Sequence, residues 1–453
     1  MKKQFYLILG DALLAIAAIY SGLFLRLGVD AGSSTIYELI EIKTAIFVVV
    51  VLFTSFILDL YNLDKNYAKK EIAAHIFIAI SLTYLLLSSL YYMIPVIFLG
   101  RGVLGISLAS MVLFQIVWHI AYKTGLSLPA FAKRVIVLGT GPLARKIGDV
   151  ILATNHNHVL SGYISSNNEL MGVPFSNVSN DEKEGLLDML KRERTDMVVV
   201  SLSERRGTFP VNEMLSCKMS GIKVMDAPSF YEQVMGKLLL ENINPSWFIF
   251  SEGFRFTRVL LIGKRISDLL LSAVGLIICS PILPFIALAV KISSPGPIFF
   301  KQLRVGEREK PFVLYKFRTM GQDAEKSSGA VWAQKDDPRV TTVGKFLRVS
   351  RLDEIPQMYN VLRGDMSFVG PRPERPEFVE KLKEIIPYYS KRHFVKPGIT
   401  GWAQVKYPYG ASVDDAIEKL RYDLYYIKNL SLALEIIIVL ETIKVVLFGR
   451  GGR

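Results

Sequence analysis

The residues best suited to chemistry are two adjacent acids, Asp353 and Glu354, which lie among cations in the stretch from Arg348 to Pro356. Pro356 is tolerated only near the beginning of a helix, so the acids are predicted to lie in a first helical turn. The helix dipole, Arg348 and Arg351 would favour negative charge there. Asp353 is therefore predicted to stay ionised, as a nucleophile that attacks phosphorus must be. An isolated acid pair beside arginines is usually a solvated helix end. Whether this pair is catalytic therefore depends on the elements around it.

The composition is that of a membrane protein with folded aqueous parts. Of 453 residues, 51% are hydrophobic and 21% are charged, and the formal net charge is +13. With so much apolar sequence, this charge favours a membrane surface over nucleic acid as the partner. Cys217, Cys279 and the five histidines show no metal-ligand spacing, so neither a disulfide framework nor a cysteine metal site is predicted.

Four apolar segments near the amino terminus predict four membrane helices, at residues 5–25, 44–58, 72–99 and 103–122. Cations gather on one side of these segments, at Lys2, Lys3, Lys65, Lys69, Lys70, Lys123, Lys133 and Arg134. The positive-inside rule therefore places the amino terminus and everything after the fourth helix in the cytoplasm. No small-residue cleavage site follows the first segment, which argues against a signal peptide.

Alternating strand and helix signals follow from residue 133 and predict a small α/β domain with a parallel sheet. Its first strand ends in Gly139-Thr-Gly141-Pro-Leu-Ala144, which matches a dinucleotide-binding turn. The acid that would bind the ribose is expected after the second strand, where the chain has Ser165 to Asn168 and then Glu169. We therefore favour a degenerate, structural or regulatory domain over a working nicotinamide site.

A fifth apolar segment, residues 266–290, has Asp268 as its only charge and is bounded by Lys264-Arg265 and Lys291. As one straight helix it would be roughly 38 Å long, enough to cross the ~30 Å hydrocarbon core. A full crossing would move the basic carboxyl-terminal part to the outside of the membrane, against the positive-inside rule. Ser280-Pro281 and Pro284 interrupt the helix, so we expect it to enter the membrane, break and return. The alternative is a spanning helix with a proline kink.

Beyond this segment, cations and glycines cluster in loops of the kind that bind diphosphates. The clusters are Lys316-Phe-Arg-Thr-Met320, Asp337-Pro-Arg-Val-Thr341, Gly364-Asp-Met-Ser-Phe-Val-Gly-Pro-Arg-Pro-Glu374 and Lys396-Pro-Gly-Ile-Thr-Gly-Trp-Ala-Gln-Val405. Arginine forks bind phosphate oxygens in pairs, and glycine lets backbone amides approach them.

Together with Leu352-Asp-Glu-Ile-Pro-Gln357, these motifs resemble the bacterial sugar transferases, the monotopic polyprenyl-phosphate phosphoglycosyl transferases. The resemblance to the catalytic part runs from about Gly263 to the end of the chain. The helices and the α/β domain resemble the long-form, exopolysaccharide-type members. The implied fold is a membrane α-helical bundle at 1–125, a Rossmann-like α/β domain at 133–245, and a mixed α/β monotopic catalytic domain at 263–453 with a re-entrant helix at 266–290.

The resemblance implies transfer of a sugar 1-phosphate from a UDP-sugar to a polyprenyl phosphate such as undecaprenyl phosphate, with release of UMP. In this family the dyad aspartate, here Asp353, attacks the β-phosphorus and forms a covalent phosphosugar, and Glu354 assists, for example by managing a proton. A magnesium ion is expected with Asp353 as its protein contact. The expected location is the cytoplasmic face of the bacterial inner membrane, where the protein meets its lipid substrate.

Ten further residues are our candidates for substrate or phosphate binding. They are Lys316, Arg318, Arg339, Arg348, Arg351, Asp365, Arg372, Arg392, Lys396 and Gly398. Ser280 and Pro281 match the break of the family's re-entrant helix. The last apolar segment, residues 432–448, carries Glu435, Glu441 and Lys444 and is interpreted as an interfacial amphipathic helix.

The sequence leaves the donor sugar open, because Lys406 to Gly410 departs from the short element that many relatives have there. Long-form relatives also suggest a homodimer. Two other functions stay open at this point: an NAD-dependent sugar-nucleotide-modifying enzyme, for which no Tyr-x-x-x-Lys pair is evident within the extended Rossmann unit, and a non-catalytic membrane scaffold of a polysaccharide machine.

Overall fold

The computed structural model divides the chain into two compact units, residues 1–227 and 228–453. The structure describes residues 2–28, 39–62, 69–126, 132–153, 158–164, 170–171, 186–201, 210–243, 248, 251–321, 324, 337–408, 410 and 412–447. All statements below refer to these residues.

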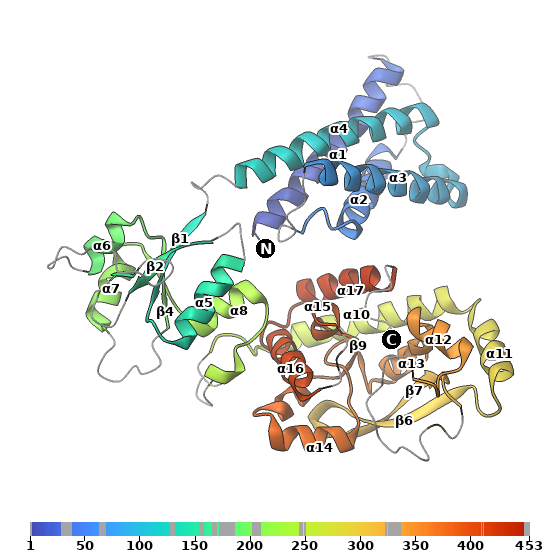
Figure 1. The fold of residues 1–453 in the computed structure, drawn as a ribbon. Helices are drawn as coiled ribbons and strands as arrows, with labels where there is room; N and C mark the ends of the chain where they lie inside the picture. The colour runs from blue at the N-terminus through green and yellow to red at the C-terminus, as the bar shows by residue number, and fades with distance from the viewer. Residues whose placement is uncertain are drawn as a thin grey trace. The chain divides into compact units, whose positions relative to one another are not determined.

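The first unit begins with four long helices: α1 (Lys2–Leu27), α2 (Ile40–Ile57), α3 (Lys69–Met93) and α4 (Arg101–Leu126) (Figure 1). In the described part of the chain, these four are long and apolar enough to cross a membrane. The prediction of four membrane helices is thereby confirmed. The third segment ends early because Pro95, which has no amide hydrogen to donate, starts a separate 3-10 turn, η3 (Pro95–Ile97).

A buried carboxylate lies inside this helical region. Asp11 of α1 is fully buried, and its Oδ2 accepts hydrogen bonds from Tyr61 (2.9 Å) and from Gln115 of α4 (2.7 Å). His119 of α4 lies 3.0 Å from the same oxygen. A polar group in an apolar environment is costly unless it is bonded, so this network ties together segments that are far apart in the sequence.

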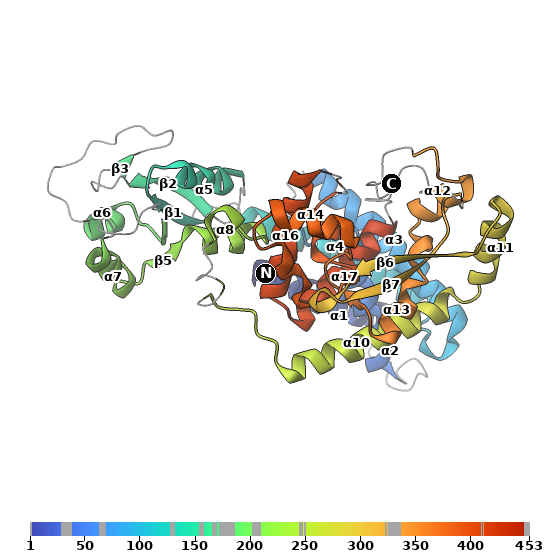
Figure 2. The same cartoon turned by 90° about the horizontal axis from the view of Figure 1, so that it is seen from below.

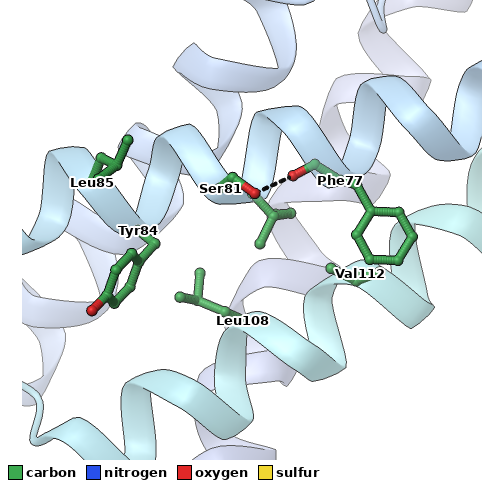
Figure 3. A pocket seen from close by; sticks show the side chains of 7 residues that line it. Phe77, Ser81, Tyr84, Leu85, Leu108 and Val112 are labelled. Carbon is green, nitrogen blue, oxygen red and sulfur yellow. Dashed lines mark hydrogen bonds between the residues drawn. The ribbon is translucent and has the colours of Figure 1, made fainter.

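An apolar groove of about 370 Å³ opens between α3 and α4 (Figure 3). Phe77 and Tyr84 line it from α3, and Leu108 and Val112 line it from α4. Ser81 also lines the groove, and its hydroxyl donates to the carbonyl of Phe77 at 2.8 Å. The groove therefore presents an apolar surface, as expected of helices that face lipid.

The second part of this unit is a mixed α/β region. It contains β1 (Lys133–Leu138), α5 (Pro142–Ala153), β2 (His158–Ile164), β3 (Leu170–Met171), α6 (Leu186–Arg192), β4 (Met197–Val200), α7 (Val211–Met219) and β5 (Lys223–Asp226). The strand order is β3-β2-β1-β4-β5, and β2, β1, β4 and β5 run parallel. Ile136 and Leu138 of β1 pack with residues of α6 and α7, and α5 covers the other face (Figure 1). The predicted parallel sheet is confirmed. Residues 165–169, where a ribose-binding acid was sought, lie outside the described residues.

The second unit begins with α8 (Ala227–Met235) and the turn η5 (Leu240–Asn242), and it contains the bent helix pair α10 (Arg258–Cys279) and α11 (Leu283–Ser293). Next come a hairpin, β6 (Phe299–Val305) and β7 (Pro311–Phe317), which are joined through η6 (Glu307–Glu309), and then α12 (Thr342–Val349), η7 (Leu352–Glu354) and α13 (Gln357–Arg363) (Figure 2). The remaining elements are β8 (Ser367–Val369), α14 (Pro376–Ile385), η8 (Tyr389–Phe394), β9 (Gly398–Thr400), α15 (Trp402–Lys406), α16 (Val413–Lys428) and α17 (Leu432–Leu447).

The apolar segment around residues 266–290 is broken where the sequence predicts. Helix α10 ends at Cys279, Ser280 is its C-cap, and α11 begins at Leu283, with an angle of 69° between the two helices. Asp268 accepts hydrogen bonds from the Ser367 hydroxyl (2.9 Å) and the Phe368 amide (2.8 Å), which explains the one charge in this segment.

Helix α17 differs from the predicted amphipathic pattern, because its charged residues face the protein. Glu435 and Lys444 are buried, and Glu435 accepts hydrogen bonds from Lys264 and Tyr426, each at 2.5 Å. Ile436 and Leu447 are exposed instead. Since charged side chains can be buried when they are paired, the sequence pattern alone did not reveal which face is turned inward.

The segment that follows β5 packs with the second unit. Glu232 of α8 bonds to Lys428 (2.6 Å) and Asn429 (2.9 Å), and the indole of Trp402 donates to the carbonyl of Gly236 at 2.8 Å. The units divide after Ala227, whereas the α/β domain was predicted to extend to residue 245.

Candidate active site

The backbone around Asp353 makes a tight turn between two helices. Helix α12 ends at Val349, Arg351 adopts a left-handed conformation (φ 56°), and Leu352–Glu354 forms the 3-10 turn η7. Pro356 is the N-cap residue of α13. The acids thus precede the α-helix and do not lie in its first turn. A positive φ at an arginine is unfavourable, and such strain is often found at functional sites.

Glu354 is surrounded by cations. Its Oε1 accepts hydrogen bonds from Lys316 of β7 (2.9 Å) and from Arg372 (2.8 Å), and its Oε2 lies 3.9 Å from Arg351. The side chain is only 10% exposed. All three cations are candidates from the sequence, and the fold brings them to one acid.

Asp353 is buried to the same degree, with 8% of the residue exposed. Its carboxylate accepts no hydrogen bond from any residue that the structure describes. The two neighbours in sequence therefore differ: the oxygens of Glu354 are paired with protein cations, whereas those of Asp353 accept no hydrogen bond from the described residues.

The electrostatics of the two acids also differ. Burial raises the pKa of Asp353, Glu354 adds to the rise, and Lys316, Arg372 and Arg348 oppose it. Burial also acts to raise the pKa of Glu354, but Arg372 and Lys316 outweigh it and hold this pKa well below its usual range. Burial lowers the pKa of Lys316. The predicted ionisation of Asp353 rested on the nearby cations, whereas burial acts on its pKa in the opposite direction.

Arg348 completes the group of cations near Asp353. It lies at the end of α12, and its Nε donates to the hydroxyl of Thr319 at 3.0 Å. The electrostatic cluster around the acids therefore comprises Lys316, Arg348, Arg351 and Arg372, which come from β7, α12, the turn before η7 and the loop after β8.

Two other predicted phosphate contacts make protein bonds nearby. Arg318 is 5% exposed and donates to the carbonyls of Val290 (3.2 Å) and Ser294 (2.6 Å) at the end of α11. Arg339 binds both carboxylate oxygens of Asp337, at 2.6 Å for the shorter contact, and this bond lowers the pKa of Asp337 to about 2.

The four remaining candidates lie outside this cluster. Arg392 bonds to Tyr389, Asp423 and the carbonyl of Arg372. Asp365 pairs with Arg363 at 3.3 Å. Gly398 is buried, and a Cβ added to it would lie 2.1 Å from the amide nitrogen of Gly370, so its glycine is required by packing. Lys396 is half-buried near Gly364.

Two cations near the site were not identified from the sequence. Arg304 of β6 acts electrostatically on Lys316 and donates to the carbonyl of Pro373 at 3.0 Å. Lys419 of α16 acts on Arg372, and it donates to the carbonyl of Gly410 at 2.7 Å. Neither belongs to a glycine-rich or proline-rich motif, so no local signal distinguished them from solvated lysines and arginines.

Comparison with known proteins agrees with the motifs at this site. A sequence model of the family described as bacterial sugar transferase matches residues 259–449. The chain is 41% identical over 237 residues to a UDP-N-acetylgalactosamine-undecaprenyl-phosphate N-acetylgalactosaminephosphotransferase of Aeromonas hydrophila, covering 52% of this chain and 55% of the relative. It is 46% identical over 184 residues to a UDP-glucose:undecaprenyl-phosphate glucose-1-phosphate transferase of Escherichia coli (strain K12), covering 40% and 39%.

A shorter relative is matched over almost its whole length. It is the exopolysaccharide production protein PSS of Rhizobium leguminosarum bv. phaseoli, 39% identical over 188 residues, which cover 40% of this chain and 94% of the relative. The chain spans only about 40% to 55% of the two longer relatives. The match to nearly all of the shorter one, together with the family model, is decisive: this chain belongs to the bacterial sugar transferase family.

Proposed function

We propose that the protein transfers a sugar 1-phosphate from a UDP-sugar to undecaprenyl phosphate and releases UMP. The observation that carries this proposal is the contrast between Asp353 and Glu354: one carboxylate has no hydrogen-bond partner among the described residues, and it lies beside one that three cations surround. A nucleophile needs free lone pairs, and a diphosphate needs cations. The names of the relatives, which act on UDP-sugars and undecaprenyl phosphate, support the same substrates.

The proposed reaction has two displacements at one phosphorus atom. An oxygen of Asp353 attacks the β-phosphorus, the bond to the bridging oxygen breaks, and UMP leaves with that electron pair. An oxygen of the lipid phosphate then attacks the same phosphorus and displaces the carboxylate of Asp353. The product is a lipid diphosphate that carries the sugar.

The cations position the substrate and stabilise its charge. Lys316, Arg348 and Arg372 act electrostatically on Asp353, so in this proposal they stabilise the charge that develops on the diphosphate in both steps. Glu354, whose pKa is lowered, is a poor proton acceptor near neutral pH, so we assign it the task of orienting Lys316 and Arg372. This differs from the proton-managing role suggested by the resemblance.

A magnesium ion fits the donor set, although no group of three acidic, histidine or cysteine side chains is found among the described residues. Magnesium is commonly bound through one or two carboxylates together with substrate phosphates, and the unbonded carboxylate of Asp353 offers the protein oxygen for this arrangement. When bound, the ion would neutralise charge on the diphosphate.

We also propose that α10 and α11 form a re-entrant pair on the cytoplasmic face and that residues 133–226 form a Rossmann-like domain. The re-entrant pair is supported by the 69° bend and by exposed Ile277, Ile278 and Phe285 on both sides of the break. The Rossmann-like domain is supported by the order of its four parallel strands. The homodimer stays a prediction.

The activity is tested with the purified full-length chain, undecaprenyl phosphate, magnesium and a panel of UDP-sugars that includes UDP-glucose and UDP-N-acetylgalactosamine. UMP release that requires the lipid and is lost in Asp353→Asn supports the transferase. Turnover of NAD without lipid would support a nucleotide-sugar-modifying enzyme. No product with any donor while the folded protein binds other assembly proteins would support a scaffold.

The topology is tested by labelling in intact cells and in inverted membrane vesicles. Arg258 is the first residue of α10 and Lys301 follows α11, and Arg258→Cys and Lys301→Cys are each made in a Cys217→Ser, Cys279→Ser background. Both cysteines should react with an impermeant maleimide only in inverted vesicles. A spanning helix predicts that one of them reacts in intact cells.

A further inference from the structure

Arg372 is supported at its backbone by a second, deeply buried arginine. The guanidinium of Arg372 donates to Glu354 at 2.8 Å, while its carbonyl oxygen accepts a hydrogen bond from Arg392 at 3.0 Å. The hydrogen bond from Arg392 therefore fixes the backbone of Arg372, which carries the guanidinium that bonds to Glu354.

Arg392 is itself held from two sides. Its Nη2 donates to Asp423 of α16 at 2.9 Å, and its Nη1 donates to the Tyr389 hydroxyl at 2.6 Å. The side chains of Arg392 and Asp423 are 6% and 2% exposed. Both terminal nitrogens of this guanidinium donate to protein groups, and its Nε is buried without a partner among the described residues, so Arg392 is enclosed by the protein and not open to solvent.

The segment before Arg372 is fixed as well, by strand β9. The amide of Gly370 donates to the carbonyl of Thr400 at 2.8 Å, and the amide of Gly398 donates to the carbonyl of Pro371 at 2.9 Å. These bonds end one residue before Arg372. Arg392 continues the support at the residue whose side chain reaches the acids.

We propose that the Arg392–Asp423 pair is a positioning device for Arg372: it fixes the Arg372 backbone so that the guanidinium meets Glu354 beside Asp353. This inference rests on the proposed function, because it gives the pair a task in the same reaction. It replaces direct phosphate contact, the role that the sequence suggested for Arg392, with an action through Arg372.

The test uses an apolar exchange of the pair, Arg392→Met with Asp423→Leu. Removing both charges leaves no unpaired buried ion, which is why such exchanges often preserve stability. The matched control is Glu232→Leu with Lys428→Met, which removes another mostly buried ion pair of the same unit (2.6 Å), formed between α8 and the last residue of α16. Tm is measured for both.

The expected result is a fall in kcat of about 10- to 100-fold for the Arg392 and Asp423 exchange, since small misplacements of a substrate-positioning group have effects of this size. The control exchange should change kcat less than about twofold, because it lies away from the reacting groups. If Arg392 acts through Arg372, the exchange should have almost no further effect in an Arg372→Ala background, since contacting residues of one network are non-additive.

A merely structural pair predicts something else: the losses in kcat multiply in the Arg372→Ala background. That result, or an exchange variant with wild-type kcat, overturns the inference. Should the apolar exchange fail to fold, Arg392→Lys replaces it. This variant keeps a charge opposite Asp423 but lacks the planar fork that reaches three acceptors, and its smaller loss in kcat should again vanish with Arg372→Ala.

Failure of the proposed function has a separate signature. If the wild-type chain releases no UMP, or if Asp353→Asn is as active as the wild type, the transferase itself is wrong. If the wild type is active and strictly requires Asp353, multiplying losses overturn only the positioning role.

Discussion

Two turns of this chain carry motifs associated with phosphate binding, one after β1 and one at η7, and the structure gives them different explanations. At Gly139, φ is 121° and a Cβ would lie 2.8 Å from the Ser201 hydroxyl. Packing and backbone conformation therefore suffice to require this glycine. At η7, Asp353 is buried and accepts no hydrogen bond from the described residues. Packing alone does not explain a buried carboxylate of this kind.

The difference shows that a site is identified by what converges on it from elsewhere in the chain. Lys316 and Arg372 reach η7 from elements that are distant in sequence, and both bind the acid next to Asp353. At Gly139 the close neighbour is Ser201, whose hydroxyl donates to the carbonyl of Leu138 and so completes a structural contact.

The largest expected effect is that of Asp353→Asn on transfer. Loss of a nucleophile removes the covalent route, so UMP release should fall by at least about 1,000-fold. Steady-state assays with saturating lipid and UDP-sugar measure this. Glu377→Gln, on an exposed acid of α14, is the control and should stay within about twofold of the wild type. Activity of Asp353→Asn near the wild-type rate would place the chemistry elsewhere.

The two acids should also have opposite effects on stability. Glu354→Gln leaves Lys316 and Arg372 without their buried counter-ion, so the free energy of unfolding should fall by about 3 kcal/mol. The pKa of Asp353 is raised, so at a pH above that value its ionised form lowers the stability of the fold, and Asp353→Asn should raise Tm at pH 8. Thermal unfolding in detergent measures both. Equal destabilisation by the two changes would show that the acids are equivalent structural groups.

The pH dependence of transfer distinguishes the acids in a further way. Attack requires ionised Asp353, so activity should be lost as the pH falls through its raised pKa. Glu354→Gln removes a charge that raises this pKa, so the acid limb should move to lower pH. Lys316→Met removes an opposing charge and should move it to higher pH. Profiles of kcat/KM against pH test the signs, and shifts in the same direction would contradict the assignment.

The smallest expected effect belongs to the turn after β1. Gly139→Ala places a Cβ at a positive φ and close to Ser201, so we expect a loss of about 1 kcal/mol in the stability of the α/β region. The rate of UMP release per folded molecule should change less than about twofold. Hydrogen exchange in β1 and β4, measured together with kcat, checks this. A loss of kcat comparable to that of the cation variants would give this turn a part in the reaction.

Local patterns in the sequence were sufficient for the four parallel strands of the α/β region, the four membrane helices and the break at Ser280, because periodicity and proline act over a few residues. They also identified Lys316, Arg351 and Arg372 from the motifs that contain them. The partners of Arg392 and Asp268 could not be predicted, because they depend on how α16 and β8 pack against other elements. Burial, which decides the direction of the Asp353 pKa shift, is likewise a property of the folded chain.

Mass spectrometry of Asp353 tests the central claim most directly. The full-length chain is mixed with magnesium and its UDP-sugar in the absence of lipid, quenched and digested. We expect the peptide that contains Asp353 to carry a sugar phosphate, and we expect added undecaprenyl phosphate to remove it. A peptide without this adduct under conditions in which UMP is released, or the same adduct in Asp353→Asn, would contradict the account.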